Sequence, residues 1–369
     1  MKTISLKKYP IFLIVILSAI SVSSTEYKGI STIWQSEITD NLFQFKPSEY
    51  SGVEIDPRFK RIFTANRKGE IISIDSQSGT VQWRYKVRNP ILHKPLLNQD
   101  ILIAGDSGGT VYALDVSKEF PKLIWQRQLT GAIISELTSY EERVFLITDR
   151  NILYSIDKKN GEIIYQANGD LYEGFSIYTN TPIIIDKSRI IYTISTGEIF
   201  VLNMSDGKQL YKINIFNTDD KIDGFTGLGI LNNHIFISTL SGTLLCLDED
   251  SGKIIWSRTL NNIVKMKIDT KTVSLVIGQN DGTIAIYDSD GKLLNKNKPL
   301  KSQIVNLNIY NKKVIIGYQN GSILILSEPD LEPITSLRLA SPLLADISFD
   351  SDSAYLYSSK GVLYKMLIK

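Results

Sequence analysis

The sequence contains few of the residues on which most catalytic and metal sites depend. Its 369 residues include one cysteine, Cys246, and two histidines, His93 and His234. A single cysteine forms no internal disulfide, and two isolated histidines do not supply the ligands of a zinc site. His93 lies just before a predicted strand and His234 lies in a predicted hairpin, so we expect exposed turn residues rather than general bases. The sequence therefore predicts no catalytic residue and no bound metal.

The chain also lacks an excess of charge. Its 41 basic and 39 acidic residues give a net charge of +2, and no long run of like charge suggests a disordered tail. Loss of an N-terminal leader that carries three lysines would bring the net charge to −1. A protein that binds the phosphate backbone needs a basic surface, so we expect no nucleic-acid partner.

Only one stretch of the chain is long and apolar, and it lies near the N-terminus. Three lysines precede "PIFLIVILSAISV" (10–22), and small residues follow it. This is the pattern of a secretory signal, and the run is shorter than the ~20 residues of a membrane-spanning helix. We predict a signal peptide over 1–24 and a single domain over 25–369. No lipoprotein cysteine follows the small residues, so we expect no lipid anchor; an uncleaved signal that holds the protein at a membrane is the alternative.

One motif is repeated along the rest of the chain. Residues 242–256 read "GTLLCLDEDSGKIIW", in which a branched apolar residue follows the leading glycine by two positions. Eight copies recur at intervals of 39 to 46 residues. A period near 40 is typical of propellers and other repeat arrays. The copies begin at Gly69, Gly109, Asn151, Gly197, Gly242, Gly282, Gly321 and Gly361.

Each residue type in the motif has a physical reason. The leading glycine, replaced once by Asn151, fits a tight turn that requires positive φ. The apolar run that follows predicts a strand buried on both faces. An Asp or Asn then precedes a second glycine in five copies, because its side chain accepts backbone N–H groups of the turn. A large ring after this turn is predicted to fill the gap between neighbouring sheets. These rings are Trp83, Trp125, Tyr165, Tyr211 and Trp256, with Trp125 following a different turn.

The motif also explains the one cysteine and the acidic residues near it. Cys246 occupies a position that other copies fill with Ser, Ala or Val, so it is predicted to be a small buried residue. Asp248, Glu249 and Asp250 lack the central glycine and the late glutamate of a calcium loop. We interpret this cluster as a turn rather than a metal site.

Further apolar runs precede several copies, as in "GLGILNNHIFISTLS" (227–241). Each copy then consists of four antiparallel strands, which is a propeller blade. After the last copy no fourth strand follows, whereas "STIWQSEI" (31–38) carries Trp34 in the aromatic position. We therefore predict an all-β, eight-bladed β-propeller whose N-terminal strand completes the C-terminal blade and leaves no blade without its outer strand.

From about Trp34 to Lys369 the chain resembles the BamB family of outer-membrane β-barrel assembly scaffolds. The copy at 242–256 is similar to the quinoprotein, or PQQ-like, repeat, roughly G-x-[IVL]-x-A-L-D-x-x-[ST]-G-x-x-x-W. The resemblance implies a non-enzymatic periplasmic scaffold without a cofactor. It also implies binding to the POTRA domains of the subunit that inserts β-barrels, support for unfolded outer-membrane proteins, and membrane association through these partners.

In the family, the contact face uses loops that lead into the middle blades, and two such segments are long in this chain. They are "GDLYEGFSIYTN" (169–180) and "FNTDDKIDGFTG" (216–227), each between a fourth strand and the next first strand. Aromatic side chains with neighbouring acids are typical of a binding patch; the alternative is that the rings fold back onto the rim. A leucine–arginine pair of the family reads Ser176–Ile177 here. The candidate partner-binding residues are Tyr172, Phe175, Ile177, Tyr178, Asp219, Asp220, Asp223 and Phe225.

Two other functions share the predicted fold. A quinone-dependent dehydrogenase has similar blades, but such enzymes use a vicinal cysteine pair, a calcium ion and a catalytic aspartate. One cysteine cannot form that pair. A generic periplasmic propeller that binds another protein or a glycan is the second alternative, and only a binding assay separates it from the scaffold.

Overall fold

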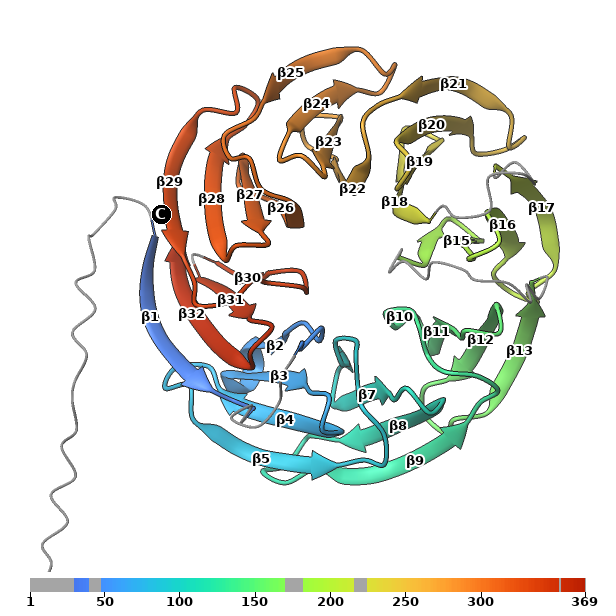
Figure 1. Ribbon diagram of the computed structural model, residues 1–369. Coiled ribbons are helices and arrows are strands. Elements are labelled where there is room, and N and C mark those ends of the chain that lie inside the picture. Colours follow the sequence, from blue (N-terminus) through green and yellow to red (C-terminus); the bar gives the residue numbers. More distant parts are fainter. Residues whose placement is uncertain (1–29, 40–47, 170–181, 216–223, 352, 369) are drawn as a thin grey trace, which may run out of the picture.

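The predicted ring of eight blades is confirmed by the structure. The computed structural model describes residues 30–39, 48–169, 182–215, 224–351 and 353–368. These residues form eight four-stranded antiparallel sheets arranged around a central axis (Figure 1). The helical content of the described chain is one short 3-10 helix, η1 (Pro57–Phe59). The predicted signal peptide over 1–24 lies outside the described residues, so its cleavage stays a prediction.

Blades are numbered by the order of their third strands along the chain. Blades 1 to 4 consist of β2 (Glu54–Asp56), β3 (Arg61–Ala65), β4 (Glu70–Asp75), β5 (Val81–Lys86); β6 (Leu96–Asn98), β7 (Ile101–Gly105), β8 (Thr110–Asp115), β9 (Lys122–Gln128); β10 (Thr138–Tyr140), β11 (Arg143–Ile147), β12 (Ile152–Asp157), β13 (Ile163–Asn168); and β14 (Ile184–Asp186), β15 (Arg189–Thr193), β16 (Glu198–Asn203), β17 (Gln209–Asn214).

Blades 5 to 8 follow the same plan. They consist of β18 (Phe225–Leu231), β19 (His234–Thr239), β20 (Thr243–Asp248), β21 (Ile254–Thr259); β22 (Ile263–Asp269), β23 (Ser274–Gln279), β24 (Ile284–Asp288), β25 (Leu293–Asn297); β26 (Ile304–Tyr310), β27 (Lys313–Tyr318), β28 (Ser322–Ser327), β29 (Pro333–Arg338); and β30 (Ser348–Asp350), β31 (Ser353–Tyr357), β32 (Val362–Ile368), β1 (Ile30–Glu37).

The order of strands in a blade defines two faces of the ring. The first strand lies nearest the axis and the fourth lies at the periphery (Figure 1). Because neighbouring strands are antiparallel, the second-to-third turns and the connections between blades leave on one face, here called the upper face. The first-to-second and third-to-fourth turns lie on the lower face. Second and third strands are buried between neighbouring blades, as the unbroken apolar runs predict.

The turn residues behave as the repeat predicts. The leading glycines have φ between 73° and 106°, and Asn151, which replaces one of them, has φ of 55°. Asn is the residue that tolerates this region best after glycine. In the third-to-fourth turn of blade 1, Oδ1 of Asp75 accepts the N–H groups of Gln77 and Ser78 at 2.9 and 2.7 Å. The acidic positions of the motif are therefore used for turns.

The aromatic positions join neighbouring blades, which confirms the predicted role of these rings. The indole of Trp125 in blade 2 lies against Gly161 in blade 3. A Cβ atom at Gly161 would be 2.6 Å from the ring. Its Nε1 donates to the carbonyl of Lys158 in the same turn, at 2.9 Å. Trp256 makes the equivalent bond to Ser289 at 3.0 Å. A ring from one blade thus caps the third-to-fourth turn of the next.

The N-terminal strand closes the ring as predicted. β1 pairs with β32 along its length, with Ser36 opposite Leu363 and Trp34 opposite Lys365. The indole Nε1 of Trp34 donates to the carbonyl of Ser76 in blade 1 at 3.2 Å. The two ends of the described chain therefore form one blade, and that blade contacts its neighbour through the same aromatic hydrogen bond that Trp125 and Trp256 make.

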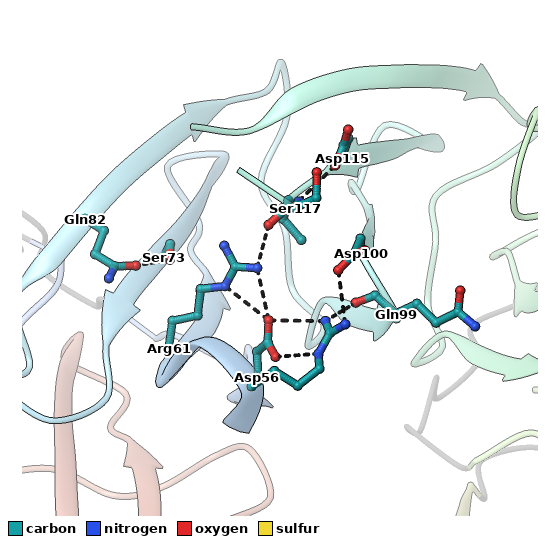
Figure 2. Close-up of polar contacts among 10 residues, drawn as sticks. Asp56, Arg61, Ser73, Gln82, Gln99, Asp100, Asp115 and Ser117 are labelled. Atoms are coloured by element: carbon teal, nitrogen blue, oxygen red, sulfur yellow. Dashed lines mark hydrogen bonds and ion pairs between the residues drawn. The ribbon is translucent and has the colours of Figure 1, made fainter. Parts of the chain in front are cut away.

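The joint between blades 1 and 2 is built differently. The indole Nε1 of Trp83 is buried without a hydrogen-bond partner. The carbonyl of Val116, which corresponds in position to that of Ser76, accepts instead from the guanidinium of Arg61. Figure 2 shows Arg61 beside Asp56, whose Oδ2 lies 3.0 Å from Nη2 of Arg61. At this joint the Arg61 guanidinium, held by Asp56, is the donor to the turn of the next blade in place of the indole.

Candidate interaction face

The two long connections leave the upper face at adjacent joints of the ring. The first runs from the end of β13 at Asn168 to the start of β14 at Ile184. The second runs from the end of β17 at Asn214 to the start of β18 at Phe225. Both join a fourth strand to the next first strand, so they start from the same face beside blade 4.

Most of the candidate partner-binding residues lie outside the described residues, so their role stays a prediction. These residues are Tyr172, Phe175, Ile177, Tyr178, Asp219, Asp220 and Asp223.

Phe225 is the candidate residue that the structure describes, and it is not an exposed anchor. It is 2% exposed at the start of β18 and packs in a cluster with Ile199, Val201 and Leu228. Its strand register places it opposite Thr239, so the ring fills the joint between blades 4 and 5. Phe225 therefore follows the alternative prediction, in which the ring folds back onto the propeller, and a partner has no access to its side chain.

The turn between β15 and β16 lies on the upper face of blade 4 and is held by side-chain hydrogen bonds. Lys212 Nζ lies 2.6 Å from Oε1 of Glu198, whose side chain is buried. Thr196 donates to Oε2 of the same carboxylate at 3.0 Å. Ser195 in turn donates to the side-chain oxygen of Asn151 in blade 3 at 3.2 Å. These bonds tie blade 4 to blade 3 and to its own outer strand at the predicted contact face.

Charged side chains from five blades meet on the ring axis, a feature that the sequence analysis did not predict. Nζ of Lys94 lies 3.2 Å from Oε2 of Glu54, and this ion pair joins blades 1 and 2. Nζ of Lys267 in blade 6 lies 2.5 Å from Oδ2 of Asp346, which leads into blade 8. Blade 7 lies between blades 6 and 8 in the ring (Figure 1), so this ion pair joins two blades that are not neighbours. The sequence signal for this cluster is a charged residue within a first strand or two positions before it.

The environment of the axis shifts several of these groups. Burial lowers the pKa of the Lys265 ammonium, although Asp346 and Glu136 lie near enough to oppose the effect. Burial also acts to raise the pKa of Asp346, but Lys267 and Lys265 outweigh it and the pKa is lowered. Burial raises the pKa of Glu54. Acids and lysines thus lie close together around the axis and offset one another's charge.

The other residues singled out in the sequence are the cysteine, the two histidines and the acidic residues near Cys246. Cys246 is fully buried on β20, as predicted, and burial raises the pKa of its thiol to about 11. Burial lowers the pKa of His93 to about 4, and neither it nor His234 is fully exposed, which corrects the prediction of exposed turn residues. Glu249 is buried against Lys187 and Arg189 at 3.1 and 3.4 Å.

Among the described residues, no group of three or more His, Cys, Asp or Glu side chains is placed to hold a metal ion. Within the described ranges, no helix is long and apolar enough to cross a membrane.

The repeat, the eight blades and their aromatic joints define a PQQ-like β-propeller. The model of the family described as "Outer membrane protein assembly factor BamB" matches residues 31–118, 117–292 and 221–342. These matches run through most of the ring, and the chain belongs to this family.

Individual relatives agree with this assignment. The outer membrane protein assembly factor BamB of Moranella endobia (strain PCIT) is 21% identical over 347 residues, 86% of each chain. The protein of the same name from Yersinia pestis is 21% identical and covers 82% of this chain and 81% of its own.

Solved structures show the same fold. BamB from Moraxella catarrhalis has a TM-score of 0.77 at 14% identity, over 92% of this chain and 100% of its own. A europium-containing methanol dehydrogenase has a TM-score of 0.74 at 9% identity, over 92% and 93%. Fold likeness therefore includes both a scaffold and an enzyme, and function depends on the site.

Proposed function

We propose that this protein is a non-enzymatic periplasmic scaffold that binds the POTRA domains of the β-barrel insertion subunit. The observation that carries the proposal is the family match along the ring, together with two long connections on one face of adjacent blades. In this function the protein supports assembly of outer-membrane β-barrel proteins and is held at the membrane by its partner. A leader over 1–24 directs export.

The proposed contact surface consists of 169–180 and 216–227 without Phe225. Aromatic anchors supply much of the binding energy at protein interfaces, and acidic neighbours set orientation and association rate. The hydrogen-bonded turn before Glu198 lies on the same face of blade 4, the blade that the two segments flank in the chain. A surface that is already ordered loses less entropy when a partner binds.

The axis of the ring supports a scaffold rather than a quinone-dependent enzyme. Lys94 and Lys267 are each bound to a carboxylate, and the chain has no second cysteine for a vicinal pair. If the protein is mixed with the quinone and calcium, we expect no change in quinone absorbance and no alcohol oxidation. Turnover of an alcohol would contradict the proposal.

A pull-down tests the partner directly. Residues 25–369 are immobilised and mixed with a soluble fragment that contains the POTRA domains, and retention is expected. The triple variant D219K/D220K/D223K should lose retention because it reverses the acidic charge of the second connection. The matched control D290K/D330K/E332K reverses three exposed charges on the lower face and should bind as the wild type does. Failure of the wild type to retain the fragment would indicate a different partner.

A further inference from the structure

Neighbouring blades are joined on the lower face by a recurring contact. The first residue of a second strand meets the residue that follows the third strand of the next blade. Arg143 donates to the carbonyl of Met204 in this way at 2.7 Å, and Arg189 donates to the carbonyl of Glu249 at 2.9 Å. In the second case the glutamate side chain is also buried, and Arg189 and Lys187 neutralise it.

The joint between blades 6 and 7 has the same glutamate without the cation. Glu328 follows β28 and corresponds in position to Glu249, while Ser274 occupies the place of Arg189. Glu328 is 8% exposed and forms no ion pair with a basic side chain among the residues described. The ionisable group that faces it is another carboxylate, Asp269, which is also 8% exposed. Two buried carboxylates without a cation cannot both be ionised at low cost.

The hydrogen bonds show where a proton belongs. Oδ1 of Asp269 accepts the N–H of Lys271 at 2.8 Å, and its Oδ2 accepts the hydroxyl of Thr272 at 2.9 Å. Oε1 of Glu328 faces the hydroxyls of Thr272 and Ser274 at 3.2 and 3.5 Å. Oε2 of Glu328 is buried and has no partner. Each oxygen of Asp269 thus accepts from a donor, as an ionised carboxylate requires. No donor in the described chain reaches Oε2 of Glu328, so a proton on this oxygen would remove a buried charge without displacing a hydrogen bond.

We propose that Glu328 and Asp269 share one proton, carried on Oε2 of Glu328, and that this proton makes the joint between blades 6 and 7 sensitive to pH. The two carboxyl groups are neighbours, because the hydroxyl oxygen of Thr272 lies 2.9 Å from Oδ2 of Asp269 and 3.2 Å from Oε1 of Glu328. When the proton leaves, the turn that contains Glu328 is repelled by the turn that contains Asp269. Asn295 and Asn297 still bind the backbone of residues 329–331, so the joint loosens locally and the blade stays folded.

The direction of the two titrations agrees with this placement. Burial, and then the charge of Asp269, raise the pKa of Glu328. Burial acts in the same direction on Asp269, but donors from Lys271, Thr272 and Glu328 outweigh it and lower the pKa of Asp269. Lys271 contributes its backbone N–H to Asp269, and Lys312 accepts the N–H of Glu328 at its carbonyl; neither forms an ion pair with the dyad. This is the pattern of a carboxylic acid dyad that holds a single proton.

The experiment compares thermal unfolding of full-length mature protein with that of E328Q between about pH 4.5 and pH 8. Above the usual glutamate range the unfolded chain binds fewer protons than the folded dyad, so wild-type stability falls as pH rises. The Gln side chain keeps a donor toward Asp269 and does not titrate. We therefore expect the melting temperature of E328Q to fall less with rising pH than that of the wild type. At pH 8 E328Q should melt about 2 °C above the wild type.

The matched control is E249Q, which changes the corresponding residue of a joint that has its cations. Because this change removes the buried counter-charge of Lys187 and Arg189, which keep only Asp186 and Asp250 as acidic partners among the described residues, we expect E249Q to melt below the wild type at pH 8. D269N offers a second test of the dyad and should also reduce the fall with pH.

Two results would overturn the shared proton. One is a pH profile that neither E328Q nor D269N changes. The other is a rise in the melting temperature of the wild type at pH 8 with calcium or magnesium chloride that E328Q lacks, which would place a metal cation between the carboxylates.

Discussion

The indole nitrogen of Trp34 donates a hydrogen bond to the carbonyl oxygen of Ser76 over 3.2 Å. This bond joins the strand that comes first in the chain to a blade that begins after it, and it repeats the contact that Trp125 and Trp256 make at other joints. The ring is therefore closed by an interaction that also connects internal blades, and loss of closure should affect the whole domain.

Removal of residues 25–40 should destabilise the entire ring. The deletion removes β1, exposes the edge of β32 and takes away the Trp34 ring that covers Gly79. An unpaired edge in the middle of the closure also favours aggregation. We expect a lower melting temperature in a single transition, measured by circular dichroism. An unchanged melting temperature would contradict closure by this strand.

Substitution G79A should weaken the same closure for two separable reasons. Gly79 has φ of 76°, where an L-residue costs about 1–2 kcal/mol, and its new Cβ would lie 2.7 Å from Cε3 of Trp34. In a W34A background the steric part is relieved and the backbone part remains, so the two changes should be non-additive. Denaturant unfolding of the four proteins measures this coupling, and strict additivity would contradict the contact.

The ion pair between blades 1 and 2 should contribute strongly to stability. Asp56 is fully buried and lies 3.0 Å from Arg61, which is itself buried. D56A leaves this guanidinium without its counter-charge, and a loss of about 3–5 kcal/mol in unfolding free energy is expected. The control D100A removes a half-exposed partner of Arg58 at 3.1 Å and should cost about 0–1 kcal/mol. Equal losses would show that burial of the pair does not matter.

The thiol of Cys246 should be unreactive in the folded protein. It is fully buried, and its pKa is raised to about 11, so at pH 8 little of it is the thiolate that reacts. A chromogenic disulfide reagent should label it only when denaturant unfolds the ring, at the rate of global unfolding. Rapid labelling in native buffer would mean that β20 is accessible in the folded state.

The repeat made most of the fold predictable. Gly242 and Asp248 mark turns, the apolar run between them forms a buried strand, and the aromatic position of Trp256 meets the next blade, all from residue types at fixed spacing. The position of Trp34 was sufficient to predict closure, because it repeats the aromatic position without its own third strand.

Features that depend on contacts between blades were not predictable in this way. Lys267 and Asp346 meet on the axis although they are far apart in the chain. Among the described residues, Glu328 faces Asp269 without a cation because Ser274 stands where another blade has an arginine. This substitution is informative only when it is known that Glu328, from the next blade, lies against this position. Phe225 was predicted as a surface anchor because it lies beside acidic residues in a long connection between blades, whereas β18 begins at this residue and its ring is buried in the core.

The central claim is that the upper face beside blade 4 binds the POTRA domains, and amide hydrogen exchange of the complex tests it most directly. The account predicts slower exchange in 169–182 and 216–227 on binding, with no change in the lower-face turns 57–60 and 328–332. Protection confined to the lower face, or none at saturating POTRA fragment, would contradict it.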